Sequence, residues 1–398
     1  MKMKTIFRSK IFEFNSFKIK QMLKNFTYFK FLKFFIKSSF LSLLLLLGYR
    51  QIPLESNYEI IHGDSELNSL IKKHLLPIDY IPTFYMPTCL AQMIYNETKS
   101  IPDIKFERQY ISTYDEGVIS LDFLVKSTEN ESSANSINTY DCHIGSSQLS
   151  NNSNFIDVNE EIDDKILVIL HGLTGGSEAT YIRETILKFQ EVEKLKIVVV
   201  NYRGISGSPL LTPMIYHAGF YDDLYEAMKY IREKYPNLRC YTLGTSMGAN
   251  IFTKLLGNVH EFDDYVKGFI SVSNPINCIE VEKRNRNGIL DRFIIKRQIK
   301  YIELHKNILK DVIDYEKISQ VKLYRQFDEF FTCKLFGFKS VEEYYEKSSS
   351  FADIPNIRVP SIFINSRDDL LSPIDSIDKN MCKNYFYKFI KTLIFFYF

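Results

Sequence analysis

Residues 238–250 read Leu-Arg-Cys-Tyr-Thr-Leu-Gly-Thr-Ser-Met-Gly-Ala-Asn, and the other predictions extend outward from them. The apolar run 240–243 predicts a strand, and residues 249–256 continue at the spacing of a helix. Glycines stand two residues before and two residues after Ser246, where a Cβ would prevent backbone and helix from approaching. The stretch therefore predicts a strand, a sharp turn and a helix, with the Ser246 hydroxyl at the apex as a candidate nucleophile.

Strand-like and helix-like segments alternate on both sides of this turn. Apolar runs predict strands at 166–170, 197–200, 269–272 and 361–365, and helical spacing predicts helices at 181–193 and 220–235. A strand pair is predicted further upstream, at 106–112 and 118–125, with Asp115-Glu116-Gly117 as its turn. Buried strands separated by helices indicate an α/β fold, in which helices cover both faces of a mostly parallel sheet.

The composition is that of a globular protein. Of the 398 residues, 45% are hydrophobic and 25% are charged, and the formal net charge is +2. Such a balance gives no reason to expect a nucleic-acid partner. The six cysteines form no C-x-x-C pair, so the sequence predicts neither a zinc site nor a dense disulfide framework.

The first fifty residues differ from the rest. Nearly every charge in 1–37 is positive, and the uncharged run that follows is shorter than the roughly 20 apolar residues of a membrane span. Extended backwards to 26–49, with its lysines snorkelling, this segment predicts a single N-terminal anchor in an endomembrane, with the N-terminus cytoplasmic. The alternatives are an interfacial helix, a cleaved signal peptide, or a disordered leader on a soluble protein.

Three loops are expected to meet at the carboxyl ends of the strands, where ligands bind in such sheets. The first carries Ser246 and the amide of Met247, and the second, after 166–170, can supply the amide of Leu173. These two amides are candidate donors to an oxyanion. The third loop supplies a carboxylate, Asp369 or, as the alternative, Asp368. Together they predict nucleophilic acyl transfer that needs no metal and no organic cofactor.

The histidine of such a site is expected after the acid, but no histidine follows Asp369 in the sequence. Only His260 and His305 follow Ser246, and we expect both to be surface residues. Residues 381–398 contain neither glycine nor histidine. We therefore expect that the last strand and the histidine-bearing loop are missing and that a basic aromatic tail replaces them.

A second short pattern, His217 followed by Asp222, matches the H-x-x-x-x-D spacing that some acyltransferases use. The spacing is loose and the motif is short. We interpret His217 as a packing residue in a turn before a helix.

Several linked motifs resemble those of the membrane-associated α/β-hydrolases of the ABHD1/2/3 and YheT type, also called the AB hydrolase 4 family. They span residues 75–373, apart from an Asn-rich insertion at 127–164. Their order and spacing together are specific for this group. The motifs are Tyr80-Ile81-Pro82-Thr83, Asp115-Glu116-Gly117, Leu121-Asp122-Phe123, His171-Gly172-Leu173-Thr174-Gly175-Gly176, Asn201-Tyr202-Arg203-Gly204, Tyr216-His217-Ala218-Gly219, the Ser246 turn, Phe327-Asp328, Phe336-Gly337-Phe338, Tyr344-Tyr345 and residues 365–369.

This resemblance implies a serine esterase or lipase that cleaves carboxylic esters of lipid-like substrates, such as glycerolipid or phospholipid acyl esters. Ser246 would be its nucleophile and Asp369 its triad acid, and the group's histidine would lie beyond residue 380. An N-terminal membrane anchor is common in the group. Two alternatives remain: a truncated or catalytically dead hydrolase without the triad histidine, and an acyltransferase.

The expected organisation has seven parts. They are a basic leader with an anchor (1–55), the N-terminal part of the hydrolase domain (56–126), a Ser/Asn-rich flexible insertion (127–164), the hydrolase core (165–275), a helical lid (276–350), an acid-bearing strand of the core (351–378) and the atypical tail (379–398).

Overall fold

The computed structural model describes residues 58–62, 95–96, 99–126, 163–286, 288–366, 369, 371–372 and 391–396. The anchor predicted at 26–49, nearly all of the insertion predicted at 127–164, and the candidate acid Asp368 lie outside these residues. Among the helices that are described, none combines the length and the apolar character needed to cross a membrane.

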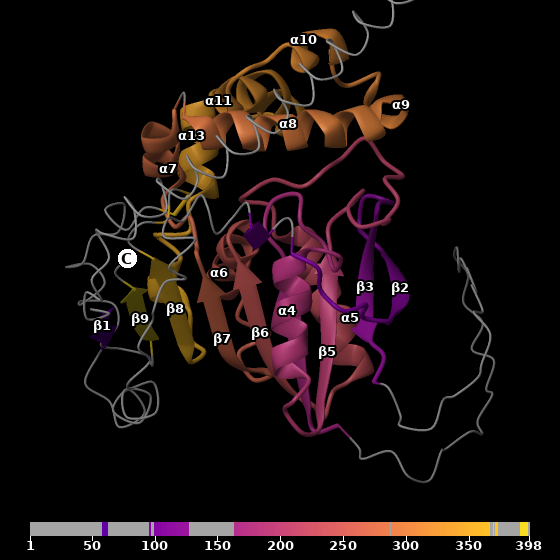
Figure 1. Ribbon diagram of the computed structural model, residues 1–398, viewed down its shortest axis with the longest axis vertical. Coiled ribbons are helices and arrows are strands. Elements are labelled where there is room, and N and C mark those ends of the chain that lie inside the picture. The colour runs from indigo at the N-terminus through magenta and orange to yellow at the C-terminus, as the bar shows by residue number, and fades with distance from the viewer. Residues whose placement is uncertain are drawn as a thin grey trace, which may run out of the picture. The chain divides into compact units, whose positions relative to one another are not determined.

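The described strands form one nine-stranded sheet in the order β1-β9-β8-β7-β6-β4-β5-β3-β2 (Figure 1). The six strands β5, β4, β6, β7, β8 and β9 are parallel to one another, whereas β3 and β1 pair antiparallel with β5 and β9 at the two sides and β2 pairs antiparallel with β3. The strands are β1 Tyr58–His62, β2 Phe106–Ser112, β3 Val118–Leu124, β4 Lys165–Leu170, β5 Leu195–Asn201, β6 Arg239–Thr245, β7 Val266–Val272, β8 Ser361–Ser366 and β9 Lys391–Phe396. The α/β fold with a mostly parallel sheet, predicted from the sequence, is confirmed.

Alternate residues of the central strands enter two separate cores because successive side chains of a strand point to opposite faces. Val168 of β4 packs with helices α5 (Asp222–Lys234) and α6 (Met247–Asn258), whereas Ile169 packs with α4 (Thr180–Phe189). Helices therefore cover both faces of the sheet. Continuous apolar runs in β4 and β5 follow directly from this double coverage.

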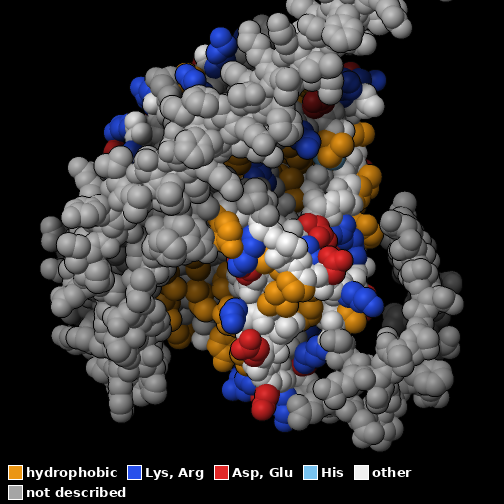
Figure 2. All heavy atoms as spheres, in the orientation of Figure 1, with side chains coloured by type: hydrophobic (Ala, Val, Ile, Leu, Met, Phe, Trp, Pro, Cys, Tyr) orange, Lys and Arg blue, Asp and Glu red, His pale blue; other side chains and the backbone are white. Residues whose placement is uncertain are grey.

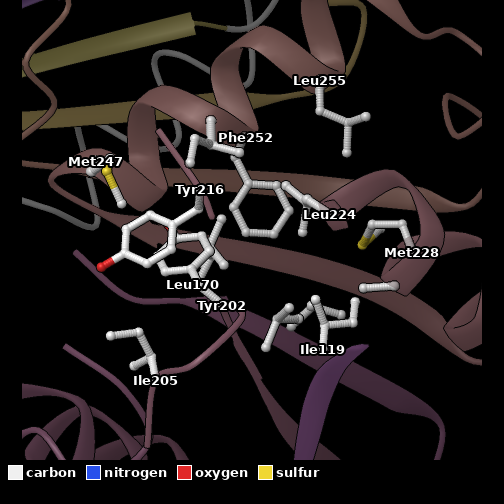
Figure 3. Packing of buried hydrophobic residues seen from close by; sticks show 14 of the residues in the cluster. Ile119, Leu170, Tyr202, Ile205, Tyr216, Leu224, Met228, Met247, Phe252 and Leu255 are labelled. Carbon is white, nitrogen blue, oxygen red and sulfur yellow. The ribbon is translucent and has the colours of Figure 1, made fainter. Parts of the chain in front are cut away.

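Figure 3 shows the larger of these cores. Phe252 of α6 lies among Leu224 and Met228 of α5, while Tyr216 and Met247 lie toward the turn that carries Ser246. The hydrophobic core thus extends to the carboxyl edge of the sheet, where it supports the loops of the candidate site.

Between β7 and β8 the chain is helical, as predicted, and we call these helices the lid. The series is α7 Cys278–Asn285, α8 Ile289–Leu304, α9 Lys306–Leu309, α10 Tyr315–Ser319, α11 Tyr324–Phe327, a π-helix at Asp328–Thr332, α12 Cys333–Phe336 and α13 Val341–Ser348. In Figure 1 they lie on the side of the sheet where the parallel strands end.

The tail supplies a strand, so the expectation that the last strand is missing is wrong. Strand β9 pairs parallel with β8, with Lys391 opposite Ser361 and Phe396 opposite Ser366, and β1 pairs antiparallel on its other side. The sequence of β9, Lys-Thr-Leu-Ile-Phe-Phe, is rich in the β-branched and aromatic residues that favour strands. Strand propensity and the free edge of β8 place the tail in the sheet without the usual motif.

Candidate active site

Ser246 lies at the apex of the turn between β6 and α6. Its φ of 54° and ψ of −121° fall in a region that residues other than glycine rarely occupy. The Ser246 amide donates a hydrogen bond of 2.8 Å to the carbonyl of Val272 at the end of β7. The predicted strand, sharp turn and helix are confirmed, and the neighbouring strand holds the strained apex in position.

Both glycines of the turn are required by close backbone contacts. A Cβ added to Gly244 would lie 2.5 Å from the Cα of Ala249, and one added to Gly248 would lie 2.3 Å from the carbonyl oxygen of Leu170. Neither distance is compatible with a side chain unless the backbone moves. Helix α6 therefore packs directly against the end of β4, as the glycine spacing predicted.

The loop after β4 lies beside the Ser246 turn, since a Cβ on Gly172 would lie only 3.2 Å from the Cβ of Ser246. Two tyrosines hold this loop. The hydroxyl of Tyr181 accepts a hydrogen bond of 2.8 Å from the Gly172 amide, and that of Tyr202 donates one of 3.0 Å to the carbonyl of His171. Neither tyrosine hydroxyl was predicted to act here, because its partner is a backbone group that leaves no sequence pattern.

The two predicted oxyanion donors are on these adjoining segments. Within the described part of the chain, the amides of Leu173 and Met247 donate no hydrogen bond. Met247 is the first residue of α6, where an amide has no partner inside the helix. Unpaired amides next to a nucleophile are the groups that can stabilise a developing negative charge.

Asp369 lies in the loop after β8, and β7 alone separates β8 from β6 in the sheet. Its Oδ1 accepts hydrogen bonds from the amides of Leu371 at 2.8 Å and Ser372 at 3.1 Å. The hydroxyl of Ser372 in turn donates to the carbonyl of Ser273, which follows β7. The acid-bearing loop is therefore tied to the same neighbouring strand as the Ser246 turn.

His171 is buried under the loop after β4. Its Nδ1 lies 2.7 Å from the carbonyl oxygen of Gly172, and its ring packs edge-on against Tyr202 with the centroids 4.4 Å apart. Burial lowers the pKa of His171 to about 4, against a smaller opposing effect of the Gly172 hydrogen bond. His171 is therefore neutral at pH 7.

His217 is enclosed by aromatic rings, which confirms its interpretation as a packing residue. The rings are those of Phe220, Phe336, Phe338 and Tyr344. Its Nδ1 accepts a hydrogen bond of 3.1 Å from the amide of Gly219, and burial lowers its pKa to about 3. No hydrogen bond between His217 and Asp222 is found among the described residues.

The two histidines after Ser246 have different surroundings. His260 is partly exposed, with its Nδ1 3.5 Å from a carboxylate oxygen of Asp263. His305 is also partly exposed, but its Nε2 lies 2.9 Å from the carbonyl oxygen of Gly204 and its ring packs on Tyr301. Neither forms a hydrogen bond with Ser246 in the part of the chain that the structure describes.

One face of α8 holds the loops of the site. Arg297, Tyr301 and the capping residue His305 recur every four residues, which places them on the same side of the helix. The first contacts the carbonyl of Thr174 at 3.4 Å, and the second donates to that of Arg203 at 2.9 Å. With the His305 contact, the lid binds the backbone of both loops that follow β4 and β5.

Motif residues far apart in the sequence pair with one another. The buried Arg203 guanidinium binds the carboxylates of Asp223 and Asp115, and the latter belongs to the turn between β2 and β3. Burial alone would lower the pKa of Arg203, but the two carboxylates outweigh it and raise that pKa further. Removing one partner would leave a buried charge uncompensated.

A second hydrogen-bond network connects the loop after β4 to strands β3 and β5. The carboxylate of Asp122 accepts hydrogen bonds of 2.6 and 2.7 Å from Arg108 and one of 2.8 Å from Asn201. It also accepts one from the hydroxyl of Ser177, whose amide donates to the Asn201 side chain. The motifs that contain Asp122 and Asn201 therefore hold the loops around Ser246.

The chain matches a family described as alpha/beta hydrolase fold over residues 165–298. Among curated proteins it is similar to a monoacylglycerol lipase of Saccharomyces cerevisiae, at 33% identity over 56% of this chain and 53% of that protein. It is also similar to phospholipase ABHD3 of Mus musculus, at 24% identity over 80% of this chain and 72% of that protein. The matched region thus spans about half the length of the first of these relatives.

Among solved structures, the chain resembles the esterase Pf2001 of Pyrococcus furiosus. The TM-score is 0.43 at 15% identity, over 75% of this chain and 87% of that one.

The fold and the Ser246 turn define an α/β-hydrolase. The chain is similar to hydrolases of the ABHD type, as the sequence motifs predicted.

Proposed function

We propose that the chain is a serine hydrolase that cleaves carboxylic esters of lipid-like substrates, namely glycerolipid or phospholipid acyl esters. The observation that carries the proposal is the strained Ser246 apex, with two amides beside it that have no hydrogen bond among the described residues. Names given to the relatives, a monoacylglycerol lipase and a phospholipase, support lipid esters as the substrate class.

In the proposed mechanism, Ser246 Oγ attacks the ester carbonyl as a general base takes its proton. The amides of Leu173 and Met247 then stabilise the oxyanion, and its collapse releases the alcohol and leaves an acyl-enzyme. Water hydrolyses the acyl-enzyme by the same steps. Asp369 would orient the base, and its two amide donors favour the ionised form that this role needs.

A specific observation favours a second candidate, a hydrolase fold that binds an acyl ligand without cleaving it. None of the described histidine side chains forms a hydrogen bond with Ser246. A serine without a base is a weak nucleophile at neutral pH.

Labelling with a fluorophosphonate probe separates the two candidates. The full chain is treated with the probe, and the modified peptide is identified by mass spectrometry. An adduct on Ser246 that is lost in Ser246→Ala supports the hydrolase, whereas an unlabelled Ser246 in folded protein favours the binding protein.

Ser273→Ala is the matched control for this experiment. Ser273 also has a positive φ, 51°, and follows the neighbouring strand β7. Its substitution should leave the labelling unchanged. A loss of labelling in both variants would mean that the fold, and not the Ser246 hydroxyl, had been lost.

A further inference from the structure

Exposed apolar side chains gather on α8, on α9 and just after α9. The large hydrophobic residues exposed in this stretch are Phe293, Leu304, Ile308 and Val312, and Leu304 is 75% exposed. These four fall within 20 residues, yet they make up four of the ten such side chains in the described residues. Exposed apolar residues scattered singly need no explanation, whereas several of them on successive helical turns, as at Leu304, Ile308 and Val312, are typical of a binding surface.

Basic side chains surround this group. Five exposed basic residues accompany two exposed acidic ones, Glu303 and Asp311, over the same stretch. The basic residues are Arg292, Lys296, Lys300, Lys306 and Lys310. Figure 2 shows several blue side chains at the upper left edge of the molecule, on the side where Figure 1 draws the lid helices. The outer face of α8 and α9 is therefore both apolar and positively charged.

We propose that this face, defined by Phe293, Leu304, Ile308 and Val312 with the five basic residues, docks on an anionic lipid surface. Helices that lie in a membrane interface combine apolar side chains with lysine and arginine in this way, and the cationic groups are attracted to acidic headgroups. A protein partner fits less well, because lysine is depleted from protein interfaces.

The inner face of the same helix explains what such docking would achieve. Tyr301 and His305 contact the carbonyls of Arg203 and Gly204 at the carboxyl edge of the sheet. A lipid surface on the outer face of α8 would therefore lie on the side of the molecule that carries the loops around Ser246. The membrane would then be the source of the ester substrate. This last step rests on the proposed function, whereas the docking itself does not.

A tryptophan reporter tests the docking directly, because the chain contains no tryptophan of its own. We would introduce Leu304→Trp into the full chain and titrate it with vesicles of phosphatidylcholine that contain phosphatidylserine. Val192→Trp is the matched control, since Val192 is 42% exposed and lies between α4 and β5, at the opposite edge of the sheet. Both positions are exposed, so neither substitution should unfold the protein.

We expect the tryptophan emission of the Leu304→Trp variant to shift to the blue on these vesicles and to be quenched by brominated acyl chains. The emission of the Val192→Trp variant should not change. The shift should be smaller on pure phosphatidylcholine and should weaken at high salt. In a variant that carries both Leu304→Asp and Ile308→Asp, the contribution of this face to the affinity for the vesicles should fall by about tenfold or more.

Either of two results would overturn the proposal. One is an unchanged emission of the Leu304→Trp variant while the chain sediments with the vesicles, which would assign binding to another segment. The other is equal quenching of the Leu304→Trp and Val192→Trp variants, which would indicate non-specific adsorption. The emission of the reporter measures docking and not hydrolysis, so a failure of this assay leaves the proposed hydrolysis untouched, and an unreactive Ser246 leaves the docking untouched.

Discussion

The buried carboxyl of Asp328 should make the stability of the lid fall as pH rises. Asp328 opens the π-helix and is 1% exposed, and it is hydrogen-bonded to Thr332 and Tyr345 at 2.8 Å each. Burial raises its pKa from 3.8 to about 7, and the two hydrogen bonds oppose this only in part. The folded protein therefore binds a proton at Asp328 that the unfolded chain has already lost above pH 4.

The magnitude follows from the difference between the two pKa values. One pKa unit corresponds to about 1.36 kcal/mol, so burying the carboxyl of Asp328 costs about 2 kcal/mol at pH 5 and about 4 kcal/mol at pH 8. Asp328→Asn is neutral at every pH and has nearly the same shape. The free energy of unfolding of this variant, relative to the wild type, should rise by about 2–3 kcal/mol between pH 5 and pH 8.

Urea denaturation of both proteins at pH 5, 6, 7 and 8 measures this difference directly. Asp311→Asn, which changes an exposed carboxylate of the same lid, is the control and should run parallel to the wild type. A constant difference between Asp328→Asn and the wild type across this range would refute the reasoning, because it would mean that Asp328 is ionised inside the lid.

Two further results are expected. His217→Phe should reduce the acid sensitivity of the fold. Burial lowers the pKa of His217 from 6.5 in the unfolded chain to about 3 in the folded protein, so the wild type loses stability as pH falls below 6.5. The drop in unfolding free energy between pH 7 and pH 5 should shrink by about 2 kcal/mol, and an unchanged drop would contradict the burial of His217 as a neutral ring. Tyr301→Phe should destabilise by about 1–2 kcal/mol and speed amide hydrogen exchange in the loop after β5, since the Arg203 carbonyl loses its donor. Tyr230→Phe, whose hydroxyl contacts only side chains, should leave that exchange unchanged, and an equal effect of both variants would argue against a specific role of the lid contact.

Local patterns predicted most of the sheet and the Ser246 turn. The periods of apolar residues placed β4 to β8 to within a few residues, because each strand carries its own burial pattern. The glycines at 244 and 248 predicted close contacts that the structure contains. Both features depend on residues that are neighbours in the sequence.

Long-range contacts were not predictable in this way. The pairing of Arg203 with Asp115 joins residues 88 positions apart, and the contact of His305 with Gly204 joins residues 101 positions apart. In the second case the partner is a backbone carbonyl, which every residue possesses. No periodicity records such a contact, so the sequence did not predict the group that His305 contacts.

The placement of the tail shows the same division. Its composition could indicate a strand, but whether that strand joins the sheet depends on the free edge of β8. In the structure β9 pairs with this edge and lies between β8 and β1. The sequence by itself determined the α/β class, the Ser246 turn and the candidate acid loop, because these follow from short-range periodicity and turn chemistry. Only the tertiary structure decided which motif residues pair, which face of α8 holds the loops and where the last strand lies, because these depend on contacts between distant parts of the chain.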